Sequence, residues 1–121
     1  MKTAILTAAL ALAMPAFAFA EGADAAFKKS DKKLNELYRQ IETRLKDNAE
    51  TRKLLVQAQQ DWVKFRDAEC SFQTAGSAGG SVMPMLIAQC MDGLTQSRVK
   101  AFEGYLNCKE GDLSCPVPAA N

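Results

Sequence analysis

Three segments of the chain repeat apolar residues at steps of three and four, and this periodicity limits the fold more than any other feature. They cover residues 24–46, 49–75 and about 82–107. Such spacing gathers apolar side chains on one face of a helix, and no alternating pattern of useful length predicts a strand. Short connections make consecutive helices antiparallel neighbours. We therefore expect an all-α fold, either a small three-helix bundle or a helical hairpin with an additional N-terminal helix.

The same spacing predicts which face of each helix is buried. In the first helix, which Asp24 would cap, the apolar positions are Phe27, Leu34, Leu37, Tyr38, Ile41 and Leu45. In the second helix they form a heptad-like seam of Leu55, Ala58, Trp62, Phe65, Glu69 and Phe72. In the third helix they are Met83, Ile87, Cys90, Leu94, Ala101, Tyr105 and Leu106, interrupted by Arg98.

Residues 1–20 have the pattern of a secretory signal peptide. Lys2 precedes an apolar run over residues 4–13, and Ala18, Phe19 and Ala20 resemble a signal-peptidase site. A membrane-spanning helix is the alternative, but it needs about 20 apolar residues. We expect cleavage after Ala20 and a mature protein in the periplasm or outside the cell, without a membrane anchor.

Four cysteines follow this segment, at positions 70, 90, 108 and 115. An even number of cysteines in an exported chain predicts disulfides. Three pairings are open, and chain economy favours Cys70–Cys90 and Cys108–Cys115. Zinc is the alternative, but the chain has neither histidine nor a C-x-x-C motif. We therefore expect a helical domain over residues 21–116 that two disulfides staple.

Composition excludes several classes of function. The chain has 15 Lys and Arg against 14 Asp and Glu, which argues against a nucleic-acid partner. Without histidine the Ser and Cys side chains lack their usual base, and no pair of carboxylates suggests acid–base catalysis. Met83, Met85 and Met91 could bind copper, although methionine at helical spacing more often fills a core. We expect a binding protein with no catalysis, no metal and no cofactor.

Polar residues could meet between the second and third helices. Trp62, Arg66 and Cys70 lie four apart on one helical stripe, so Arg66 could cover the Trp62 ring. The expected cluster comprises Arg66, Glu69, Thr95 and Arg98. It is either a binding site or, the interpretation we favour, a structural network, because a semi-buried charge needs a partner.

A flexible connection separates these two helices. Its small residues are Gly76, Ser77, Gly79, Gly80 and Ser81. An exposed loop of this kind could enter a partner's cleft, but a plain connector is the interpretation that sequence alone favours. Beyond Pro116 we expect residues 117–121 to be disordered.

Taken together, these motifs resemble the LprI-type lysozyme inhibitor N-terminal domain family of exported bacterial proteins. The residues that carry the resemblance are Leu34, Asn35, Tyr38, Gln59, Trp62, Arg66, Cys70, Cys90, Thr95 and Arg98, followed by Cys108 to Pro116. The resemblance spans residues 24–116. It implies an exported, all-α, disulfide-bonded domain whose partner is a lysozyme; another envelope protein is the alternative partner.

Overall fold

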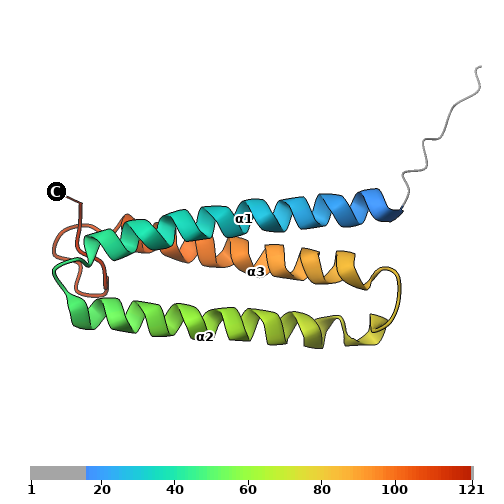
Figure 1. The fold of residues 1–121 in the computed structure, drawn as a ribbon. Helices are drawn as coiled ribbons and strands as arrows, with labels where there is room; N and C mark the ends of the chain where they lie inside the picture. Colours follow the sequence, from blue (N-terminus) through green and yellow to red (C-terminus); the bar gives the residue numbers. More distant parts are fainter. Residues whose placement is uncertain (1–15, 121) are drawn as a thin grey trace, which may run out of the picture.

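The computed structural model describes residues 16–120, and this part of the chain is helical without strands (Figure 1). The elements are α1 (Ala16–Arg44), α2 (Ala49–Gln73), the 3-10 turn η1 (Ala75–Ser77) and α3 (Met83–Leu106). The helices alternate in direction. The α1–α2 connection and the C-terminal segment therefore share one end of the molecule, and the α2–α3 connection lies at the other. The expected all-α fold with three helices is confirmed.

The core lies between α1 and α3. The residues of α1 that fill it are the predicted Leu34, Leu37, Ile41 and Leu45, and those of α3 are Val99, Phe102 and Leu106. Ile41 and Phe102 have no exposed surface, and the Tyr38 ring stacks on Phe102 with 6.4 Å between centroids. Because each large apolar side chain contributes about 1.5–3 kcal/mol when buried, the α1–α3 contact provides most of the apolar stabilisation.

α2 contacts this pair through a narrower seam. Leu55 and Trp62 of its predicted inner face pack against the core, but Phe65 and Phe72 do not. Phe65 and Phe72 are 54% and 76% exposed, whereas the buried residues of α2 are Arg66 and Cys70. The disulfide from Cys70 to Cys90 explains the difference. It turns Cys70 toward α3, and Arg66, one turn earlier, follows it inward. The two phenylalanines then point to solvent.

α1 also begins earlier than predicted. Asp24 does not cap the helix but lies within it, where its carboxylate pairs with Lys28 at 2.9 Å. The alanine-rich segment before Asp24 has high helix propensity, which lets the helix continue toward the N-terminus without a cap. The expected signal peptide falls mainly on residues 1–15, outside the described residues, and its expected cleavage point lies within α1.

Both expected disulfides are confirmed. Cys70 and Cys90 join the end of α2 to α3, with Cα atoms 5.6 Å apart. Cys108 and Cys115 close the loop that follows α3, with Cα atoms 6.1 Å apart. The first bridge therefore fixes the base of the α2–α3 connection, and the second turns the chain back toward the bundle.

Residues 117–120 of the C-terminal segment differ from the disorder expected for residues 117–121, of which Asn121 lies outside the described residues. Val117 is only 4% exposed and packs in the core cluster. Arg44 holds the segment from α1, because its Nη1 donates to the carbonyl oxygens of Leu106 at 2.9 Å and Pro118 at 3.4 Å. The neighbouring Cys108–Cys115 bridge limits the freedom of this part of the chain, which lowers the entropy lost when Val117 is buried.

Candidate functional site

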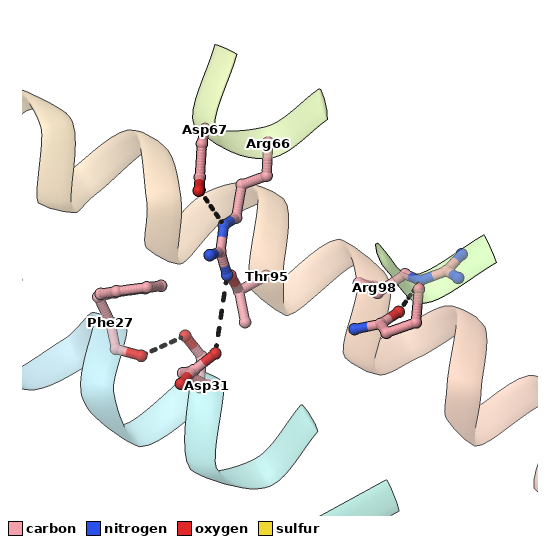
Figure 2. Close-up of polar contacts among 8 residues, drawn as sticks. Phe27, Asp31, Arg66, Asp67, Thr95 and Arg98 are labelled. Carbon is pink, nitrogen blue, oxygen red and sulfur yellow. Dashed lines mark hydrogen bonds and ion pairs between the residues drawn. The ribbon is translucent and has the colours of Figure 1, made fainter. Parts of the chain in front are cut away.

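Arg66 lies buried where all three helices meet (Figure 2). Its Nε donates to Asp67 Oδ1 at 3.1 Å, and its Nη1 donates to Thr95 Oγ1 on α3 at 3.4 Å. The same Nη1 lies 3.7 Å from Asp31 Oδ1 on α1. One guanidinium thus joins α2 to both neighbouring helices, and its charge has two carboxylate partners.

Aromatic rings enclose the two arginines. The Arg66 guanidinium lies 5.2 Å from the centroids of both Phe27 and Trp62, which confirms the expected contact with Trp62. The Arg98 guanidinium lies 5.7 Å from the centroid of the Trp62 ring and 4.7 Å from the centroid of the Phe102 ring. Cation–π attraction is stronger for such desolvated groups than at an exposed surface.

Arg98 has a different polar environment from Arg66 and lies apart from it along α3 (Figure 2). Its Nε donates to Gln59 Oε1 at 3.1 Å. No carboxylate forms an ion pair with it in the described part of the chain. Burial lowers the pKa of Arg98, and the nearby Tyr105 partly opposes this shift.

The expected cluster of Arg66, Glu69, Thr95 and Arg98 is therefore wrong for Glu69, and the two arginines have separate polar partners. Glu69 joins neither arginine; its Oε1 accepts a hydrogen bond from Gln73 at 3.1 Å. Three residues after Arg66, it lies to one side of the buried stripe, where solvent still reaches it. The carboxylates that do pair with Arg66, Asp31 and Asp67, were missed because local periodicity does not contain the register between helices.

The remaining residues of the family resemblance have mixed positions. Leu34 is buried in the core, and Tyr38 packs against it. Gln59 orients Arg98, as described above. Asn35, in contrast, is exposed on α1. Most of these positions therefore support the packing of the three helices.

The connection from α2 to α3 is an ordered loop at one end of the bundle (Figure 1). Thr74, only 6% exposed, begins it and donates from Oγ1 to the Cys70 carbonyl at 2.7 Å. Backbone bonds follow from Ser77 to Thr74 at 3.0 Å and from Gly80 to Ser77 at 2.9 Å. Gly79 has φ +79°, a conformation that favours glycine.

The charge distribution around this loop is unusual for the chain. No charged residue occurs between Glu69 and Asp92, so the whole loop end of the α2–α3 hairpin is neutral. The five small residues predicted for the loop are exposed or half-exposed. The loop is uncharged and accessible, and a disulfide fixes its base.

Within residues 16–120 no group of His, Cys, Asp or Glu side chains is arranged to hold a metal ion. Met83 and Met91 line an apolar hollow beside Phe27 and Ile87. In the same range no helix is both long and apolar enough to cross a membrane.

Comparison with known proteins adds a family relationship to this geometry. Residues 13–102 match the sequence profile of the family described as lysozyme inhibitor LprI. An uncharacterized protein of Rhizobium meliloti (strain 1021) is 26% identical over a region that covers 73% of this chain and 71% of its own. No solved structure gives a significant match. The matched region includes both arginines, the neutral loop and the Cys70–Cys90 bridge.

Proposed function

The chain belongs to the LprI family of lysozyme inhibitors, and on this premise we propose that it binds and inhibits a lysozyme-type muramidase. The family match is the observation that carries the proposal. The two disulfides support action in an oxidising compartment, where such bonds persist. We take residues 1–20 as the signal peptide, residues 21–116 as the inhibitory domain, and the periplasm or the exterior of the cell as the place of action.

We infer that the loop from Gly76 to Ser81 is the segment that enters the enzyme. Lysozyme-type catalysis uses two carboxyl groups that flank the scissile bond in a cleft. A neutral loop meets no repulsion from these carboxyl groups. The hydroxyls of Ser77 and Ser81 can donate hydrogen bonds to a carboxylate. The Cys70–Cys90 bridge favours binding because a pre-ordered loop loses less entropy on association.

A charge placed in the loop tests this inference. Ser81→Asp introduces one carboxylate just before α3, where a negative charge is compatible with the helix N-terminus. It would face the enzyme's own carboxylates, and we expect inhibition to weaken by at least about tenfold, since like charges at an interface cost several kcal/mol. The measurement is the inhibition constant against c-, g- and i-type lysozymes.

Gln40→Glu is the matched control, because it adds the same charge at an exposed position of α1 toward the opposite end of the bundle. Its inhibition constant should stay within about twofold of the unmodified protein. Equal inhibition by Ser81→Asp would reject the loop as the binding segment. Unchanged muramidase activity of all three lysozymes at micromolar protein would reject the inhibitory function itself.

A second candidate function is docking to another envelope protein, and the outer face of α2 favours it. Leu54, Phe65 and Phe72 are 70%, 54% and 76% exposed. They are separated by 11 and 7 residues, close to whole numbers of helical turns, so they form one stripe. Exposed apolar stripes of this kind mark interaction surfaces in many proteins.

This alternative has its own test. Phe65→Ser with Phe72→Ser should leave the free energy of unfolding within about 0.5 kcal/mol, since both side chains are exposed. We expect the unmodified protein to form cross-linked complexes in periplasmic extract. The double variant should lose these complexes and still inhibit lysozyme. If the complexes survive the double substitution, the stripe is not a docking surface.

A further inference from the structure

A pocket of about 250 Å³ lies where the α1–α2 connection approaches the C-terminal segment. Every main element contributes to its wall, and the wall is largely apolar. The residues that the argument uses are Ile41, Leu45, Leu55, Ala58, Tyr105 and Val117. Its lining includes residues beside the α1–α2 connection and in the C-terminal segment. Both lie at the opposite end of the bundle from the α2–α3 connection, so the pocket is separate from the surface proposed to bind lysozyme.

Arg98 is the one charged residue in the wall of this pocket. A guanidinium carries five N–H groups. The Nε–H of Arg98 donates to Gln59, but its terminal amino groups have no hydrogen-bond acceptor within residues 16–120. Arg66, one layer away, has two carboxylates and a hydroxyl instead. Among the half-buried and buried arginines of residues 16–120, Arg66 has carboxylate partners, Arg44 donates to two backbone carbonyls, and Arg98 has neither an anion nor an acceptor for its terminal amino groups.

The orientation of Arg98 suits it for binding. The Phe102 ring at 4.7 Å and the Trp62 ring at 5.7 Å hold the guanidinium plane, while Gln59 fixes Nε. A carboxylate could then accept from the terminal amino groups, the strongest hydrogen-bond geometry that arginine offers. Tyr105, two turns further along α3, lines the same pocket.

We propose that this pocket binds a short-chain aliphatic carboxylate, with Arg98 pairing to the carboxylate and the apolar wall enclosing the chain. The class of ligand follows from the two properties of the pocket, one fixed cation and a hydrophobic interior. Its length follows from the volume, which is below the usual range of about 300–1,000 Å³ for small-molecule sites. Octanoate is a suitable probe.

Trp62 makes the binding measurable without a label, because it is the only tryptophan of the chain and contacts Arg98. We expect octanoate to produce a saturable change in tryptophan fluorescence of the oxidised protein. Octanol, which has the same chain without the charge, should bind at least about tenfold more weakly. The assay contains no lysozyme, so its result is independent of the proposed inhibition.

Two variants separate the pocket from a surface effect. Arg98→Gln should weaken octanoate binding by about tenfold to a hundredfold, the range for lost charge-assisted hydrogen bonds. Ala58→Phe keeps Arg98 and adds a bulky ring to the pocket wall at an exposed position of α2, and it should also weaken binding by at least about tenfold. Arg39→Gln, at an exposed site on α1, should change nothing.

Any of three results would overturn the proposal. One is the absence of a saturable change up to about 10 mM octanoate. Another is equal affinity for octanol and octanoate. The third is unchanged binding by Ala58→Phe, which decides the question even if Arg98→Gln does not fold; circular dichroism verifies the fold of each variant.

Discussion

Arg66 occupies a position where loss of one side chain affects three helices. Its guanidinium contacts Asp31 on α1, Asp67 on α2 and Thr95 on α3. Removing one member of a buried ion pair usually costs about 3–5 kcal/mol. Here the cost is smaller, because the two carboxylates are 42% and 53% exposed and water can solvate them.

We therefore expect Arg66→Ala to lower the free energy of unfolding by about 2–3 kcal/mol, measured by urea denaturation. Arg39→Ala, which removes an exposed arginine from α1, should change it by no more than about 0.5 kcal/mol. Arg66→Lys keeps the charge but not the planar group between Phe27 and Trp62, so it should restore only part of the loss. Equal stability of Arg66→Ala and Arg39→Ala would show that the network is not structural.

Tyr38 gives the fold a dependence on alkaline pH. Burial raises the pKa of its phenol, and the nearby Glu42 carboxylate raises it further. The folded state thus holds the phenolic proton more tightly than the unfolded state, whose pKa is about 10. This contribution to stability is complete below that value and is lost as the pH rises from it toward the folded pKa.

Tyr38→Phe removes the titrating group and keeps the ring that stacks on Phe102. Urea unfolding at several pH values between about 8 and 11 should show a steeper decline for the unmodified protein than for the variant above pH ~10. Other groups that titrate in this range are common to both proteins. Parallel declines would contradict the role of Tyr38.

At the scale of the elements, α2 is the helix whose attachment depends on few contacts. It provides no member of the fully apolar core, and its buried residues are Arg66 and Cys70. The Cys70–Cys90 bridge closes a loop of 20 residues, for which chain entropy predicts about 3 kcal/mol of stabilisation. α2 should therefore be the first helix to separate.

Cys70→Ser with Cys90→Ser tests this expectation. We expect a loss of about 3 kcal/mol in the free energy of unfolding, and amide exchange in α2 should accelerate far more than exchange in α1. Cys108→Ser with Cys115→Ser provides the comparison, since it opens the bridge in the loop that follows α3 and does not involve α2. If both double variants expose α2 equally, the bridge from Cys70 does not hold this helix selectively.

The elements also show how far sequence reasoning extends. The inner face of α1 was predictable because the helix has one apolar stripe, and Leu34 and Ile41 lie on it. Of the face predicted for α3, only Leu106 is buried in the core cluster; the buried Val99 and Phe102 were missed. α2 carries two stripes, and the more hydrophobic one, with Phe65 and Phe72, faces solvent. Which of the two stripes turns inward depends on the residues of α1 and α3 that contact Arg66 and Cys70, and these contacts cannot be read from the α2 sequence.

The candidate site was predictable to a similar extent. The position of the small-residue loop and the contact of Arg66 with Trp62 follow from local spacing. Asp31 is 35 residues from Arg66, so its ion pair depends on a register that no local pattern contains. Val117 was missed for the same reason, since a lone apolar residue after a proline has no periodicity.

For the whole molecule, the two ends of the bundle have different properties. One end presents the neutral loop, and the other holds the Arg98 pocket beneath the C-terminal segment. The α1–α3 pair extends between the two ends, and its apolar core includes neither Cys70 nor Cys90. Opening that bridge should therefore release the loop and leave the pair folded.

Lysozyme inhibition before and after reduction tests this separation. The reduced protein should keep the helical circular dichroism of α1 and α3, because their contact is apolar, but its inhibition should fall by at least about tenfold as the loop loses its fixed base. Cys108→Ser with Cys115→Ser should inhibit as strongly as the oxidised protein, since its remaining bridge is the one beside the loop. Inhibition that survives reduction in a still-folded protein would show that binding does not need the loop's rigid base and would place it elsewhere on the bundle.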